Sequence, residues 1–232
     1  MCGLWNNDHI LEVLVRTLRA EELRLREEQS VHGLDRCAEV ALHAVLCRGF
    51  EDHGFGAFRE RVYPCAAVPR SRLTERQRCD LVLTRSPSLS PLDPDEQHRA
   101  AAASAGTLFA HAAPPASSVG CPPEEAFWLE LKLVGQFAFS RGVPVPNATY
   151  SSELVTGLSA DLNKLAADPM IRHGAAALVL FNSDAEIAGH DVRALRDRTA
   201  RRGPARAFLQ DDFEVLDRIG NRVCTVIVVP VR

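Results

Sequence analysis

The chain has 232 residues, 46% of them hydrophobic and 25% charged, a balance typical of a globular protein with a sizeable core. Its formal net charge of −3 argues against a general attraction to nucleic acid, so any such binding must come from a local basic patch. The 7 cysteines are scattered without a C-x-x-C spacing, which argues against a disulfide framework or zinc knuckle and favours a reducing, cytoplasmic location. No apolar run is long enough for a signal peptide or a membrane span, so we expect no membrane partner.

The first part of the chain predicts two helices. Over residues 8–29, apolar residues such as Ile10 and Leu14 recur at helical spacing, and the second half is rich in Glu and Arg. We expect this helix to form an N-terminal extension, 1–33, that packs on the same core, with a protein partner or a homodimer as the alternative. A second helix is predicted over 34–48 from its apolar stripe.

Two strands and a long insertion follow. Residues 58–68 predict a strand, which Pro64 marks as an edge or an irregular end. Residues 78–84 predict the next strand. Between residues 86 and 125 the composition shifts to Ser, Pro and Ala, which predicts an inserted flexible loop with a short helix at 95–104.

The remaining elements alternate between strands and helices. They are a strand at 126–139, a turn-rich link at 140–149, a helix at 151–167, a strand buried on both faces at 175–181, a helix at 185–201, and strands at 213–218 and 222–231 joined as a hairpin. This order predicts an α/β protein with a central mixed β-sheet flanked by helices, folded as a single domain over residues 1–232.

Two charged residues interrupt the apolar strand at 126–139. Glu130 and Lys132 are two positions apart, so in a strand they point to the same face, where burial is costly. Lysine plus arginine total 27, yet only Lys132 and Lys164 are lysines, so a lysine in a core strand indicates a specific use of its compact ammonium group. The alternative is a structural Glu–Lys pair on a half-exposed strand.

Further carboxylates accompany this strand. Asp80 leads the apolar run 81–83, and Glu39 lies on the preceding helix. Carboxylates on adjacent strands suit a hard cation such as Mg²⁺, with Mn²⁺ as a substitute, and such a cation can polarise a phosphoryl oxygen and activate water. The alternatives are that Asp80 caps a turn or pairs with a nearby arginine, and that Glu39 forms a surface ion pair.

The segments RCDLVLT, with Asp80, and FWLELKLVGQF, with Glu130 and Lys132, resemble the PD-(D/E)xK nuclease superfamily, which has the restriction-endonuclease-like fold. Glu39 in DRCAEVALHAVL, the DLNKL helix and the buried strand GAAALVLF support the resemblance, which spans about residues 34–181. The sequence departs from the family pattern in carrying Cys79 where many members have proline, and in the long gap between Asp80 and Glu130.

The resemblance implies an αβββαβ core and a metal held by Asp80, Glu130 and the carbonyl of Leu131. It also implies that Lys132 positions the attacking water, and that Glu39 matches an acidic residue that some members carry on a helix.

Basic residues in the second half of the chain are candidates for phosphate contact. We expect Lys164, Arg196, Arg201 and Arg202 to bind nucleic acid. The alternatives are a local ion pair between Asp161 and Lys164 and a solvated arginine-rich helix face.

The function predicted from these patterns is that of a Mg²⁺-dependent nuclease, a hydrolase that cleaves phosphodiester bonds of DNA or RNA with metal-activated water. The alternative is a catalytically silent member of the same fold that binds nucleic acid or a protein. A third reading is a metal-dependent hydrolase of another phosphate ester.

Overall fold

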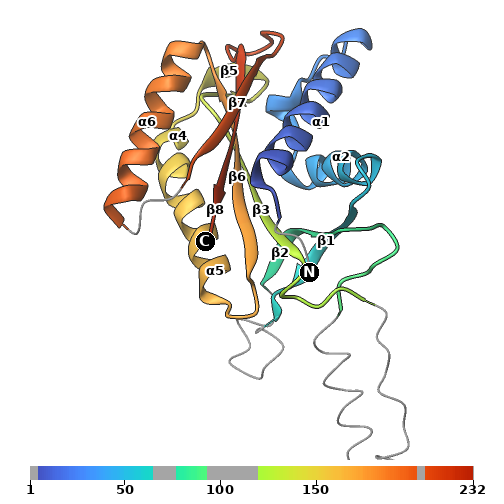
Figure 1. The fold of residues 1–232 in the computed structure, drawn as a ribbon. Coiled ribbons are helices and arrows are strands. Elements are labelled where there is room, and N and C mark those ends of the chain that lie inside the picture. Colours follow the sequence, from blue (N-terminus) through green and yellow to red (C-terminus); the bar gives the residue numbers. More distant parts are fainter. Residues whose placement is uncertain (1–4, 65–76, 93–119, 203–206, 232) are drawn as a thin grey trace, which may run out of the picture.

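The computed structural model describes residues 5–64, 77–92, 120–202 and 207–231. Its centre is a 6-stranded sheet in the order β1-β2-β3-β6-β8-β7, with helices on both faces (Figure 1). One neighbouring pair of strands is parallel and the others are antiparallel. The predicted α/β class with a central mixed sheet is therefore confirmed. Among these residues no helix combines the length and apolar character needed to cross a membrane.

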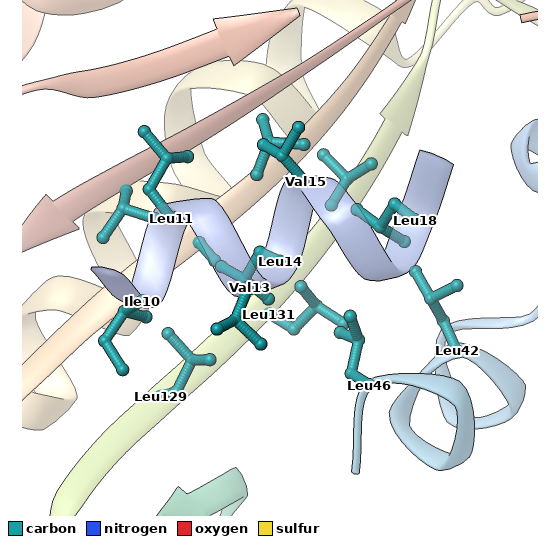
Figure 2. Packing of buried hydrophobic residues seen from close by; sticks show 14 of the residues in the cluster. Ile10, Leu11, Val13, Leu14, Val15, Leu18, Leu42, Leu46, Leu129 and Leu131 are labelled. Carbon is teal, nitrogen blue, oxygen red and sulfur yellow. The ribbon is translucent and has the colours of Figure 1, made fainter. Parts of the chain in front are cut away.

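Helices α1 (Asn7–Glu27) and α2 (Glu39–Asp52) cover one face of the sheet (Figure 1). The Asn6 side chain caps α1 by accepting hydrogen bonds from backbone N–H groups of its first turn. Figure 2 shows the apolar stripe of α1 lying over β3 and against α2. The N-terminal helix is thus part of the core. The side chains that share this contact are Ile10, Leu14, Leu18, Leu42, Leu46, Leu129 and Leu131.

The second helix begins later than its apolar pattern predicts. Residues Leu34–Arg36 form a separate 3-10 turn, and Ala38 is extended, with ψ of 139°. This break restarts the helix at Glu39. The carboxylate of Glu39 therefore lies in the first turn of α2, where the helix dipole favours a negative charge.

Strands β1 (Gly56–Val62), β2 (Arg78–Thr84) and β3 (Phe127–Gly135) form an antiparallel meander. Strand β1 lies at the edge of the sheet, as Pro64 predicted. The strand ends before that proline, and residues 65–68 of the predicted strand lie outside the described part of the chain.

The connection after β3 is more ordered than predicted. The strand expected over 126–139 is interrupted at Gln136, and a separate two-stranded ribbon follows, made of β4 (Phe137–Ser140) and β5 (Val143–Pro146). The prediction of a turn-rich link was therefore wrong for β5. Gly142, with φ of 82°, supplies the left-handed conformation that the tight turn of this ribbon needs.

A helix of three segments leads from this ribbon back to the sheet. It comprises α4 (Tyr150–Ser152), the π-helical turn η4 (Glu153–Gly157) and α5 (Leu158–Ala167). It precedes β6 (His173–Asn182), which runs parallel to β3 and is almost fully buried, as predicted. Helix α6 (Ala185–Arg202) then packs on the same face of the sheet as α5 (Figure 1).

The last two strands form the predicted hairpin with a different boundary. Strand β7 (Leu209–Glu214) starts before the predicted 213–218, and β8 (Val223–Pro230) agrees with the prediction. The earlier end of β7 has a local cause, because Asp217 accepts a hydrogen bond of 2.8 Å from the backbone N–H of Gly220 and so closes a turn.

The two ends of the predicted insertion 86–125 are joined to each other by backbone hydrogen bonds. The backbone N–H of Leu92 donates to the carbonyl of Cys121 over 2.9 Å, and the N–H of Cys121 donates to the carbonyl of Ser90 over 2.8 Å. The remaining stretch 93–119, with the helix predicted at 95–104, lies outside the described residues.

Candidate functional site

Strands β2 and β3 separate at the position where the predicted acids lie. They pair only through residues 81–83 of β2 and 127–129 of β3. Asp80 and Glu130 are the next residue on each strand. The Asp80 Oδ2 accepts a hydrogen bond of 2.7 Å from the backbone N–H of Leu131, so a side chain takes the place of the backbone ladder. We call this point of divergence the fork.

Asp80 and Glu130 form an acid pair at the fork. Glu130 is 3% exposed, and the carboxyl of Asp80 is hydrogen bonded to it. Burial, together with the charge and hydrogen bond of Asp80, raises the pKa of Glu130 to about 8. The hydroxyl of Tyr63 donates to Glu130 Oε1, and this contact and the charge of Lys164 offset only part of the rise. Without a cation the acid pair therefore holds a proton near neutral pH.

Tyr63 is a contact of the acid pair that sequence reasoning missed, and the Cys79 thiol lies near the pair. The ring of Tyr63 stacks on Trp128 with 6.0 Å between centroids, which holds its hydroxyl at Glu130. Burial, followed by the charges of Cys79 and Glu130, raises the pKa of this hydroxyl. The Cys79 thiol is buried and donates toward the carbonyls of Leu81 and Leu129, each at 3.4 Å. No spacing in the sequence signals the Tyr63 contact, because Tyr63 follows β1 and Glu130 lies on β3, 67 residues further along the chain.

Lys132 and Glu39 form a second charged pair beside the fork. The Lys132 Nζ lies 3.3 Å from Glu39 Oε2, and each side chain is about one-third exposed. The aliphatic stem of Lys132 lies along η4, because a Cβ placed on Gly157 would be 3.3–3.5 Å from three of its carbons. Glycine at this position keeps the helix close to the stem and directs the ammonium group toward α2. The structure thus brings together two of the predicted catalytic residues from distant segments.

His43 lies between this pair and the acid pair. It follows Glu39 by one helical turn, and its side chain is 2% exposed. Its Nε2 lies 3.9 Å from Asp80 Oδ1, and its Nδ1 lies 3.7 Å from Glu60 Oε1. The sequence signal that could have pointed to His43 is its i, i+4 spacing from Glu39 on the same helix.

A cleft of 510 Å³ opens beside His43, between the start of α2 and strand β1. Arg59 and Arg61 on β1 contribute to its wall together with Glu60. The cleft therefore has positively charged side chains in its wall and lies next to the fork. Its other lining residues are Val40, Ala57 and Phe58.

Lys164 reaches the acid pair from α5, on the opposite side from α2. Its Nζ lies 2.7 Å from Asp161 Oδ1, which confirms the local ion pair considered from the sequence. Burial lowers the pKa of Lys164, but the hydrogen bond with Asp161 and the charges of Glu130 and Asp80 outweigh burial and raise the pKa overall. The chain's two lysines thus lie on different elements near the acid pair, Lys132 on β3 and Lys164 on α5.

The predicted arginine patch is in another part of the molecule. Helix α6 packs against β6 and β8, away from the fork (Figure 1). The guanidinium of Arg196 lies 5.6 Å from the ring centre of Phe208, and the side chain of Arg202 is outside the described residues. The structure does not bring Arg196 or Arg201 together with the acid pair, and nucleic-acid binding by this helix stays a prediction.

Comparison with known proteins identifies no relative of this chain. No family model matches the sequence, and neither the curated proteins nor the solved structures contain a significant match.

Proposed function

We propose that this chain is a divalent-cation-dependent nuclease that hydrolyses phosphodiester bonds with metal-activated water. The proposal includes a restriction-endonuclease-like αβββαβ core, formed by α2, β1–β3, the α4–α5 helix and β6. The order of these elements and the position of Asp80, Glu130 and Lys132 on them support the resemblance to the PD-(D/E)xK superfamily.

The acid pair carries the proposal. Two carboxyls from adjacent strands meet in a buried site, and desolvation together with the charge of Asp80 raises the pKa of Glu130. A divalent cation would relieve both effects, so Asp80 and Glu130 fit the oxygen ligands that Mg²⁺ or Mn²⁺ requires. When bound, the metal would supply Lewis-acid polarisation of the phosphoryl oxygen and a water of lowered pKa. A role of the Leu131 carbonyl as a further ligand is part of this proposal.

Lys132 is the residue to which we assign positioning of the attacking water. Glu130 and Lys132 lie two positions apart on one strand, so the ammonium group projects beside the acid pair. The contact with Glu39 holds the ammonium in place at 3.3 Å, and a partly exposed lysine can hold and reorient a water.

Nucleic acid is the substrate class that the surroundings favour. Arg59 and Arg61 line the cleft next to the fork, and Lys164 borders the acid pair from the other side. Cations on both sides of a cleavage site suit a polymer with a phosphate at every residue more than a compact phosphate ester.

A catalytically silent binding module is the second candidate. One observation favours it: Glu130 is buried and its carboxyl already accepts a hydrogen bond from Tyr63. If this contact persists in the presence of cations, the acid pair keeps its proton and the protein binds nucleic acid or a protein without cleaving.

Calorimetric titration with Mn²⁺ tests the metal site. The wild-type chain should bind Mn²⁺ and release protons near neutral pH, and Glu130→Gln should lose that proton release and bind more weakly. Glu153→Gln, a substitution at a carboxylate of η4 bonded to Thr149 and Asn147, is the matched control. Cleavage of labelled single- and double-stranded DNA and RNA with Mg²⁺ or Mn²⁺ then separates the two candidates, and binding without cleavage of any of them would favour the silent module.

A further inference from the structure

His43 is a buried imidazole whose ring nitrogens receive no hydrogen bond from the part of the chain that the structure describes. The residue is 1% exposed, and among those residues neither Nδ1 nor Nε2 has a partner. A buried polar atom without a hydrogen bond is unfavourable, so two on one side chain of a core helix indicate a missing partner. The nearest carboxylate oxygens, at 3.7 and 3.9 Å, are too far for hydrogen bonds.

The surroundings of His43 have the composition of a cation site. One ligand atom each of Glu39, His43 and Asp80 lies within 4.8 Å of the other two. Neighbouring ligands about 2.1 Å from a common ion in tetrahedral or octahedral geometry are about 3.0–3.4 Å apart, so the three side chains would need to close by up to about 1–2 Å. Glu39 and His43 are one turn apart on α2, which fixes two of the three ligands on one rigid helix.

Asp80 can serve this cluster without leaving the acid pair. Its Oδ2 is held by the N–H of Leu131, and its Oδ1 faces Nε2 of His43. The Lys132 ammonium contacts Glu39 through Oε2. The carboxylate of Asp80 therefore lies between Glu130 on one side and His43 on the other.

We propose that Glu39, His43 and Asp80 form a second cation site that takes a first-row transition-metal ion in preference to Mg²⁺. An imidazole nitrogen suits such ions, whereas Mg²⁺ prefers an all-oxygen shell with several waters. The proposal goes beyond the nuclease function, because the site holds its ion through His43 and does not need Glu130.

The rival arrangement is a protonated His43 that acts as the cation itself, between Asp80 and Glu60. It predicts no ion at this position and an equal role for Glu60, which contacts the other ring nitrogen. The metal site predicts that Glu60 is dispensable. The two arrangements therefore differ in the response to a substitution at Glu60.

Electron paramagnetic resonance of Mn²⁺ mixed with the full chain tests the site, because free Mn²⁺ gives a strong signal that is lost on binding. We expect at least one Mn²⁺ per chain to remain bound in a hundredfold excess of Mg²⁺. His43→Gln should weaken this Mg²⁺-resistant binding about tenfold or more, and Glu60→Gln should leave it unchanged.

Two further variants keep the test decisive. Since His43 is buried and His43→Gln could fail to fold, Glu39→Gln at the partly exposed start of α2 should give the same loss. Glu130→Gln should retain Mg²⁺-resistant binding even if the acid pair binds no metal, which separates this site from the proposed function. Displacement of all Mn²⁺ by Mg²⁺, or equal Mn²⁺ affinity in wild type, Glu39→Gln and folded His43→Gln, would overturn the proposal.

Discussion

Two of the most deeply buried carboxylates in the described part of the chain, those of Glu22 and Glu130, are compensated in opposite ways. Glu22 on α1 is 2% exposed, and its Oε1 accepts hydrogen bonds from Arg218 Nη1 at 2.8 Å and from the backbone N–H of Leu216 at 3.0 Å. Glu130 at the fork is equally buried but faces a second carboxyl, that of Asp80. The charge of Glu22 is balanced by an arginine, whereas no described residue places a positive charge at hydrogen-bonding distance from Glu130.

The difference separates a structural role from a functional one. The Glu22–Arg218 ion pair joins α1 to the segment between β7 and β8. Because this segment and α1 are far apart in sequence, the ion pair stabilises the tertiary fold. The acid pair stabilises nothing by itself, because burying two like carboxyls is unfavourable. Such an arrangement is expected where a ligand supplies the missing charge.

The largest expected effect is a loss of catalytic turnover on substitution of Lys132, beside the acid pair. Lys132→Met keeps the aliphatic stem beside Gly157 but removes the ammonium, so turnover should fall by roughly 10²–10⁴ while nucleic-acid binding stays near wild type. Lys132→Arg should also fail, because a planar guanidinium cannot occupy the same point. The measurement is single-turnover cleavage of labelled nucleic acid. Arg16→Met, at an exposed cation paired with Glu12, is the control, and undiminished cleavage by Lys132→Met would refute the assigned role.

The second prediction concerns the Glu22–Arg218 ion pair, in which the buried carboxylate is compensated. Arg218→Met leaves the Glu22 carboxylate buried without its partner, so the free energy of unfolding should drop by about 3–5 kcal/mol. Urea denaturation followed by circular dichroism measures it. The exposed ion pair of Arg222 with Asp217 offers the matched control, Arg222→Met, which should cost under about 1 kcal/mol. Similar losses in both variants would show that burial does not distinguish the two pairs.

The third prediction concerns the pH dependence of stability that the uncompensated Glu130 should cause. The pKa of Glu130 is about 8 in the folded chain and near 4.3 when unfolded, so the folded state binds the proton more tightly. Metal-free stability should therefore fall as pH rises from about 4.5 to 8, by roughly 1–3 kcal/mol.

Glu130→Gln is the control for this pH dependence. Its amide does not ionise, so the part of the slope due to Glu130 should vanish, and the variant should be more stable than wild type at pH 8. Saturating Mn²⁺ should reduce the wild-type slope as well. Thermal melts in a pH series measure both effects, and an identical slope in wild type and variant would contradict the raised pKa.

The smallest expected effect concerns the segment between the two strands of the fork. Replacing 93–119 by a short Gly/Ser linker should change the free energy of unfolding by only about 1 kcal/mol, because residues 90–92 and 120–121 already join the two ends. We expect substrate preference to change, since the segment joins the strands that carry the acids. Loss of a cooperative melt would show that the segment belongs to the core.

Local sequence patterns determined most elements of this fold. Period-3.6 and continuous apolar runs predicted α1, β2, β6 and α6 close to their observed bounds, because their burial repeats over neighbouring residues. The errors fall where a single residue interrupts a pattern. Gln136 divides the strand predicted at 126–139, and the turn at Asp217 shifts β7 toward the N-terminus.

The sequence also determined that Asp80, Glu130, Lys132 and Glu39 needed an explanation, since each is a charge within or beside an apolar pattern. Only the tertiary structure decided how they are grouped: Asp80 with Glu130, Lys132 with Glu39, and both groups next to His43. Likewise only the fold brought Tyr63 to Glu130 and separated the arginines of α6 from the fork. The physical reason is that burial periodicity is a property of neighbouring residues, whereas a charge acquires its partner from strand order and helix placement, which join segments far apart in the chain.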